Sequence, residues 1–174
     1  MRVPRFPEPA ATGMVTIGAE PDEAYLIISD PPSMALLAEE TYSAHWLDGT
    51  TTPAVGARFR GYNRNGPRRW ATTCSVTDAE PGRCFAYEVT APFNLPISRW
   101  QYDIERTADG CTVTETSWLR APVWLLPLSV AITGVANRRG ANDANIATTL
   151  HRLKAYLEKT PNLHSDGRPA DTAH

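Results

Sequence analysis

Metal-binding patterns and an excess of charge of one sign are both missing from this chain of 174 residues. Lysine and arginine number 17 and aspartate and glutamate 19, so the formal net charge is −2. That balance gives no overall electrostatic reason to bind nucleic acid or an anionic membrane. The four histidines are scattered, and His164 and His174 lie close to the C-terminus. The sequence therefore predicts no metal site, no cofactor and no nucleic-acid partner.

Cysteine is rare as well. The three cysteines, at positions 74, 84 and 111, form no CxxC or Cys/His pattern. An odd count without a secretion signal favours reduced thiols and a cytoplasmic location. Residues 1–13 lack the apolar core of such a signal, and we expect a flexible leader there. A flexible tail is expected over 160–174, which leaves 14–159 as one domain.

No hydrophobic run is long enough to cross a membrane. The most apolar segment is APVWLLPLSVAITGVA, residues 121–136. It is shorter than a transmembrane helix, and Pro122 and Pro127 interrupt it, so we expect no stable membrane insertion. The preferred interpretation is a buried linker that enters the last helix, and a lip that touches a membrane is the alternative.

A long C-terminal helix is the strongest feature that is present. Over residues 127–158 the apolar side chains recur every three or four positions, which is typical of one helical face. This stripe comprises Leu128, Ile132, Val135, Ile146, Leu150, Leu153 and Leu157. Arg139 and Asn142 interrupt it, which indicates that the helix covers something other than a dry core. The alternative is a bent or later-starting helix, because Gly134 and Gly140 weaken the first half.

The preceding chain reads as one strand, two short helices and six further strands. The first strand is expected near residues 14–20, and the helices begin at Pro21 and at the 31–32 proline pair, since proline suits the first turn of a helix. The six strands are expected at 41–49, 56–63, 68–79, 83–91, 97–106 and 111–120. Short strands joined by tight turns form an antiparallel meander, so the predicted order is β-α-α-β6-α.

The turns predict which side chains share a face of the sheet. The first hairpin turn sets Phe59 opposite Thr72, and the second sets Val76 opposite Tyr87. The inner face then collects Phe59, Gly61, Trp70, Thr72, Cys74, Val76, Phe85, Tyr87, Val89, Trp100, Tyr102 and Ile104. In the last strand, a three-residue turn places Trp118, Thr116 and Thr114 on this face, whereas a two-residue turn places Val113 and Glu115 there. We favour the three-residue turn.

Aromatic side chains dominate the predicted inner face. A sheet that only packs on a helix usually presents Val, Ile and Leu. Large rings on a curved sheet leave gaps, and buried tyrosine and indole groups need polar partners. An aromatic-lined cavity with a few polar groups is typical of a small-molecule site. The alternative is that the rings simply fill a core.

Four segments carry a family resemblance: GARFRGYNRNGPRRW, EPGRCFAYEV, RWQYDIERTADGCTVTET and the closing TLHRLKAYLE. With the predicted element order, they resemble the START-like, or SRPBCC, superfamily, and most closely its polyketide cyclase/dehydrase and lipid transport branch. The resemblance covers residues 14–159. It implies an α+β helix-grip fold, in which a curved antiparallel sheet wraps a long C-terminal helix and leaves a cavity. Members bind lipids, sterols, polyketides or other apolar molecules, and some catalyse cyclisation or hydrolysis, so fold alone does not assign function.

The candidate ligand-binding residues are Phe59, Trp70, Thr72, Phe85, Tyr87, Trp100, Tyr102, Trp118, Arg139, Asn142 and Ile146. A buried Arg139 would need an acidic ligand group or a protein carboxylate. The hydroxyls could orient a ligand, or could bond to backbone or water. Glu115 and His45 form the only plausible acid–base pair, but nothing in their spacing shows that they meet, and we predict no catalytic residue.

Three classes of function follow. The first is a protein that binds a small hydrophobic molecule, such as a lipid or polyketide. The second is a cyclase or aromatase, which the lack of a convincing acid–base pair disfavours. The third is a protein-interaction or chaperone-regulator module, which would show an exposed apolar patch without a large cavity. The sequence leaves the ligand, the pathway and a homodimer open.

Overall fold

The computed structural model describes residues 8–159. Its strands are β1 (Ala11–Ile17), β2 (Thr41–Trp46), β3 (Arg58–Asn65), β4 (Arg68–Glu80), β5 (Cys84–Ala91), β6 (Leu95–Thr107) and β7 (Gly110–Leu119). Its helices are α1 (Pro21–Ile28), α2 (Pro31–Leu37), α3 (Leu126–Thr133) and α4 (Arg138–Lys159), with short 3-10 turns η1 (Pro92–Asn94) and η2 (Val123–Leu125).

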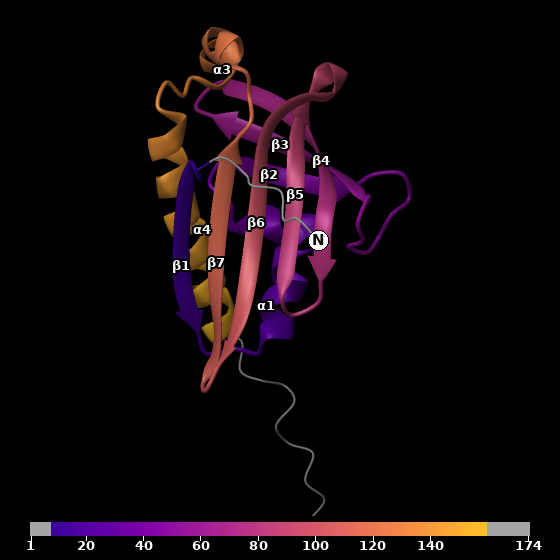
Figure 1. Ribbon diagram of the computed structural model, residues 1–174, viewed down its shortest axis with the longest axis vertical. Coiled ribbons are helices and arrows are strands. Elements are labelled where there is room, and N and C mark those ends of the chain that lie inside the picture. The colour runs from indigo at the N-terminus through magenta and orange to yellow at the C-terminus, as the bar shows by residue number, and fades with distance from the viewer. Residues whose placement is uncertain (1–7, 160–174) are drawn as a thin grey trace, which may run out of the picture.

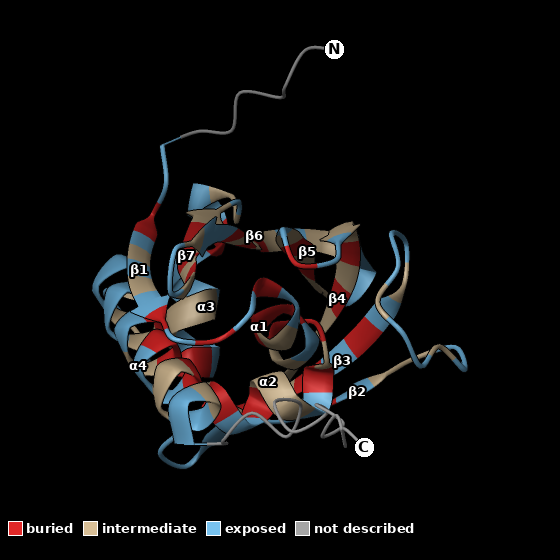
Figure 2. Ribbon diagram, turned by 90° about the horizontal axis from the view of Figure 1, so that it is seen from below, coloured by how far each residue is buried: buried red, intermediate tan, exposed pale blue. Residues whose placement is uncertain are grey.

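One antiparallel sheet of seven strands, in the order β1-β7-β6-β5-β4-β3-β2, forms the body of the molecule (Figure 1). Seen from its end, the sheet curls into an open ring with α1 and α2 on its concave side (Figure 2). The long helix α4 packs beside β1, and α2 packs beside β2. The predicted α+β helix-grip architecture is confirmed.

The two short helices begin where the sequence provides caps. Pro21 opens α1, and Glu20 and Glu23 form a capping box around its first turn. Asp30 caps α2 by accepting a hydrogen bond from the backbone nitrogen of Ser33 at 3.0 Å. Such caps satisfy backbone donors that a short helix cannot satisfy itself.

The N-terminal strand begins earlier than predicted. Ala11 is buried and pairs with Ser117, so regular structure starts three residues before the expected boundary at residue 14. A Cβ atom on Gly13 would lie 2.7 Å from Cγ2 of Ile146, so glycine lets α4 approach β1 closely. Residues 1–7 of the predicted leader and the predicted tail, 160–174, lie outside the described residues.

The hairpin registers keep the predicted inner face. Val76 lies opposite Tyr87, as predicted. Phe59 lies opposite Cys74 rather than Thr72, because the turn residues are 66 and 67 instead of 65 and 66. Moving the turn by one residue shifts the pairing by two, and side chains alternate with a period of two, so the same residues still face inward.

The predicted orientation of the last strand is wrong. A two-residue turn joins β6 to β7, with Thr107 opposite Gly110. Tyr102 therefore lies opposite Glu115, which faces inward, while Trp118 pairs with Arg99 on the outer face. The tighter turn changes the register by an odd number of residues, which reverses every side chain in the strand.

The C-terminal segment is two helices, not one. Helix α3 ends at Thr133 and is capped by Gly134, whose left-handed φ of 74° costs glycine little. Helix α4 then begins at Arg138, so the later-starting alternative is correct. The first part of the predicted stripe is not buried: Leu128 is 55% exposed. The buried grip consists of Ile146, Leu150 and Leu153.

The segment before α3 is also not the buried linker that the sequence suggested. Val123 and Trp124 are exposed, although Leu125 between them is buried. Val123 and Leu126 line the cavity and are nevertheless exposed, so this segment forms part of the cavity's solvent-facing border. Among residues 8–159, no helix has the length and apolar character required to cross a membrane.

Candidate functional site

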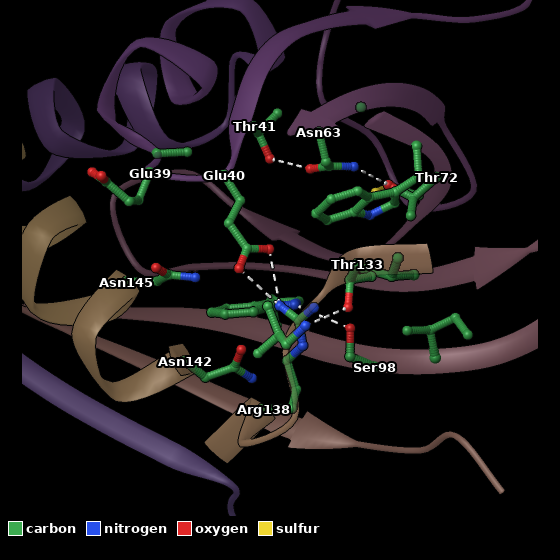
Figure 3. Close-up of a pocket in the computed structure, with 18 of the residues that line it drawn as sticks. Glu39, Glu40, Thr41, Asn63, Thr72, Ser98, Thr133, Arg138, Asn142 and Asn145 are labelled. Atoms are coloured by element: carbon green, nitrogen blue, oxygen red, sulfur yellow. Dashed lines mark hydrogen bonds and ion pairs between the residues drawn. The ribbon is translucent and has the colours of Figure 1, made fainter. Parts of the chain in front are cut away.

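A cavity of about 510 Å³ lies between the concave face of the sheet, helices α2 and α3, and the first half of α4 (Figure 3). Small-molecule sites usually measure about 300–1,000 Å³. The predicted site residues that line it are Phe59, Trp70, Thr72, Tyr87, Trp100, Tyr102, Arg139 and Asn142. Alternation along β3 to β6 brings the rings together, because each of these strands turns its odd- or even-numbered residues inward as a set.

Three predicted site residues lie elsewhere. Phe85 and Ile146 are fully buried in the hydrophobic core beside the cavity, where Tyr25 packs edge-on against the Phe85 ring at 6.4 Å. Trp118 is on the outer face of β7 and does not line the cavity. Phe85 and Ile146 therefore support the cavity walls. Trp118, which was predicted to line the cavity, lies outside it.

An ion pair spans the rim of the cavity. Arg138 donates from Nη1 to both carboxylate oxygens of Glu40, at 2.9 Å each (Figure 3). Both side chains are only 21% exposed. The sequence predicted that Arg139 would be the buried, paired arginine. Arg139 lines the cavity but is exposed, and the arginine that pairs with a carboxylate is the preceding residue, Arg138.

A row of polar groups crosses the wall formed by β2, β3 and β4. Thr41 donates through its hydroxyl to Oδ1 of Asn63 at 2.7 Å, and Nδ2 of Asn63 donates to the hydroxyl of Thr72 at 3.3 Å (Figure 3). Asn63 is buried. Sequence reasoning missed Asn63 as a cavity residue, although its alternation with Phe59 and Gly61 would have placed it on the inner face.

The floor of the cavity holds a buried carboxyl group. Glu115 is 2% exposed, and its Oε1 accepts a hydrogen bond from the Tyr102 hydroxyl at 2.8 Å. Within residues 8–159, no hydrogen-bond partner reaches Oε2. Burial raises the pKa of Glu115 from its ordinary value of 4.5 to about 8, and the Tyr102 hydrogen bond opposes that rise only in part. Such a carboxyl is largely protonated at neutral pH.

Tyr87 and Cys74 complete the aromatic side of the cavity. The Tyr87 hydroxyl donates to the sulfur of Met34 at 3.7 Å, and the ring packs against Phe59 at 5.1 Å. Burial raises the pKa of Tyr87 well above its usual value and raises the pKa of Cys74 to about 12. Both side chains are therefore uncharged across the neutral range.

Asn142 lies where the sequence predicted a polar break in the helical face. It is buried, lines the cavity, and donates from Nδ2 to the hydroxyl of Ser117 at 3.3 Å. The hydroxyl of Ser98 accepts from the indole nitrogen of Trp100 at 3.1 Å. These bonds fix the polar groups around the floor, which leaves the rings free to contact an apolar ligand.

The acid–base pair considered from the sequence does not form. His45 is exposed on the outer face of β2 and stacks on Tyr62 at 5.6 Å. Glu115 faces inward on β7. Glu115, Glu40 and Arg138 were all missed as site residues. The two-residue turn would have identified Glu115, but no sequence signal connects Glu40 to a residue 98 positions away.

Comparison with known proteins agrees with this architecture. Residues 9–158 match the model of the family described as polyketide cyclase / dehydrase and lipid transport. A similar solved structure is the Polyketide_cyc-like protein Cgl2372 from Corynebacterium glutamicum, with 27% identity, a TM-score of 0.60 and coverage of 94% of this chain and 100% of the other. Searching the curated proteins returned no match.

Two further structures share the fold at lower identity. The di-domain ARO/CYC StfQ from the steffimycin biosynthetic pathway is 16% identical with a TM-score of 0.66, and the match covers 85% of this chain and 50% of StfQ. DynU16, a putative protein in the dynemicin biosynthetic locus, is 16% identical with a TM-score of 0.56, over 85% of this chain and 46% of DynU16. This chain thus spans about half of each. The START-like resemblance is confirmed.

Proposed function

The chain belongs to the polyketide cyclase / dehydrase and lipid transport family, and on that premise we propose that it binds a small hydrophobic molecule and releases it unchanged. Family membership supports a hydrophobic ligand-binding or cyclase role. The observation that carries the choice is the cavity of about 510 Å³, lined by aromatic rings and closed by polar groups at its floor and rim. A lipid, a polyketide or another apolar or aromatic molecule fits this description.

The lining favours an apolar ligand. Phe59, Trp70 and Trp100 offer ring surface, and α2 and α3 add Met34 and Leu126. Removal of apolar surface from water contributes about 2.5 kcal/mol for each 100 Å² buried. Lost motional freedom offsets part of this on binding, so shape and a few polar contacts determine affinity.

A binding experiment tests the proposal directly. Protein purified from its native cells is analysed by mass spectrometry for a co-purified small molecule. The molecule is then titrated back while tryptophan fluorescence is followed, to which Trp70 and Trp100 in the cavity wall contribute. We expect an apolar compound that is recovered unchanged. A native preparation without bound compound, together with no fluorescence response to a panel of lipids and aromatic polyketides, would contradict the proposal.

A matched pair of variants places the binding site. Ala44 lines the cavity on β2, and Ala44→Leu adds side-chain volume inside it. His45 is the next residue and faces solvent, so His45→Leu adds an apolar side chain outside the cavity. We expect about a tenfold or greater loss of affinity for the first variant, which corresponds to about 1.4 kcal/mol, and little change for the second. Equal affinities would place the ligand elsewhere.

A cyclase-type enzyme is the second candidate. The observation that favours it is the Glu115 carboxyl, which faces the cavity beside the Tyr102 hydroxyl and has its pKa raised by burial to about 8. A protonated carboxyl could donate a proton to a carbonyl oxygen during ring closure. Incubation with a linear poly-ketone, analysed by mass spectrometry for loss of water, distinguishes the candidates. Turnover that disappears in Glu115→Gln would replace the carrier proposal.

The protein-interaction class is less well supported. It predicts an exposed apolar patch without a large cavity. The exposed side chains of Val123, Trp124 and Leu128 do form an apolar surface on η2 and α3. The large cavity directly beneath them favours the ligand-binding classes instead.

A further inference from the structure

One polar group in the cavity is incompletely satisfied. Glu115 lies in the middle of β7, opposite Tyr102 on one neighbouring strand and Gly13 on the other. Its Oε1 is engaged by the Tyr102 hydroxyl, whereas Oε2 is buried without a hydrogen-bond partner within residues 8–159. Buried polar atoms are nearly always paired, and Glu115 lines the cavity, so its unpaired oxygen indicates a place for a ligand atom.

The surroundings of Glu115 determine its protonation state. Tyr102 on β6 and Tyr87 on β5 are the titratable side chains that interact with it electrostatically in the described part of the chain. Cys74 on β4 interacts with Tyr87, and all three are kept neutral by burial. Helix α4 presents the uncharged Asn142, and Arg138 at the rim is paired with Glu40.

Two arginines line the same cavity, but neither lowers the pKa of Glu115: Arg138 is paired with Glu40, and Arg139 is exposed. Burial then favours the neutral acid and raises the pKa to about 8. A neutral carboxyl has one O–H donor. Because Oε1 already accepts from Tyr102, the proton is carried on Oε2, the oxygen that lacks a partner.

We propose that Glu115 is the polar anchor of the cavity, and that its Oε2 donates a hydrogen bond to an uncharged acceptor oxygen, of the ketone or other carbonyl class, on an otherwise apolar ligand. This inference rests on the proposed binding function and adds a recognition rule to it. Specificity follows because a site built around a buried donor rejects an analogue that lacks the acceptor. Deprotonation would remove the donor and place a negative charge against the carbonyl oxygen.

Two probes with one ring skeleton test the rule. Fluorenone carries a carbonyl, and fluorene is the same skeleton without it. Affinities are measured by tryptophan fluorescence at about pH 6 and about pH 9.5, on either side of the Glu115 titration. At the higher value Tyr87 and Tyr102 remain protonated because burial raises the pKa of both well above the usual value.

Two substitutions separate hydrogen bonding from packing. Glu115→Gln keeps a donor of similar shape and cannot titrate, and Glu115→Leu keeps the approximate volume and removes the donor. Wild type is expected to prefer fluorenone about tenfold at the lower pH and to lose most of that preference at the higher pH. The Gln variant should prefer fluorenone at both values, and the Leu variant should bind both probes alike.

A spectroscopic measurement reports the contact itself. The carbonyl stretch of bound, isotope-labelled fluorenone should fall in frequency in wild type and in Glu115→Gln, relative to Glu115→Leu. A purely structural role for Glu115 would not move this band. Urea unfolding of each variant shows whether the fold is retained, and the Gln variant keeps the test decisive if Leu does not fold.

The outcomes distinguish this inference from the binding function on which it rests. If both probes bind but wild type and Glu115→Leu show the same preference and the same carbonyl frequency, Glu115 is not the anchor and the binding function stands. Preference for fluorenone that rises with pH would also overturn the anchor. If neither probe nor any other apolar compound binds, the binding function fails and the inference fails with it.

Discussion

Arg138, in the first turn of α4, donates two hydrogen bonds of 2.9 Å to the carboxylate of Glu40, which lies between α2 and β2. The pair joins the helix that grips the sheet to the far edge of that sheet. Because it stands at the rim of the cavity and is mostly buried, it ties together two walls of the cavity.

Loss of this pair should loosen the rim. We expect Arg138→Ala to lower the free energy of unfolding by about 1–2 kcal/mol, since a partly buried, two-bond pair exceeds the usual surface value. Dissociation of a bound ligand should become faster, which stopped-flow fluorescence measures. For the unfolding measurement Arg139→Ala is the control, because Arg139 is the exposed neighbour on the same turn. Equal effects of the two variants on the free energy of unfolding would show that the pair does not hold the rim.

The stability of the ligand-free protein should depend on Glu115. Its pKa is about 8 in the folded state and near its ordinary value of 4.5 when unfolded, so the folded state holds the proton more tightly between those values. The contribution of protonated Glu115 to the free energy of unfolding is fully present below the unfolded pKa. This contribution declines as pH rises toward 8, by up to about 1.4 kcal/mol per pH unit. Urea unfolding from pH 5 to pH 8 measures the slope, which Glu115→Gln should flatten.

Close packing of α4 on β1 should make Gly13 sensitive to substitution. A Cβ atom there would meet Ile146 at 2.7 Å, so Gly13→Ala should destabilise the protein by about 1–3 kcal/mol through overpacking. Gly18, just after the same strand, has its nearest potential contact at 3.7 Å and serves as the control. Gly18→Ala should change stability by less than about 0.5 kcal/mol. Similar thermal midpoints for both variants would rule out the steric explanation.

Half-buried Cys84 should be a poor nucleophile despite its partial exposure. Burial, together with the nearby carboxylates of Asp103 and Asp78, raises its pKa to about 12. At about pH 8 the thiolate then accounts for about one molecule in ten thousand. Iodoacetamide labelling, followed by mass spectrometry, should be slow in the native state and fast in urea. Rapid native labelling at position 84 would contradict the raised pKa.

The comparison between sequence and structure shows which inferences are robust. Phe59 was assigned the wrong partner but the right face, because a shift of two residues preserves the alternation of a strand. Trp118 was predicted to face inward and Glu115 outward, whereas the structure has the reverse, because a change of one residue in the turn reverses that alternation. The fold was predictable, since it depends on periodicity and element order, whereas the site depended on a single turn.

Long-range pairs account for the rest of what the sequence could not supply. Glu40 and Arg138 have no local pattern that connects them, and their contact exists only after the sheet has curled. The break at Gly134 was visible as an alternative, because glycine weakens a helix, but its left-handed φ was not. The cytoplasmic location and the homodimer stay predictions.

The packing of the last helix against the first strand has a consequence for how the protein is made. The backbone nitrogen of Gly18 donates to Oε1 of Glu158, and the backbone oxygen of Thr16 accepts from Nζ of Lys154. The ribosome adds both side chains about 140 residues later. We expect β1 to leave the ribosome with both of its neighbours, β7 and α4, still unsynthesised. The cavity then forms only when the two ends of the domain meet, so an incomplete nascent chain has no pocket in which to hold a ligand.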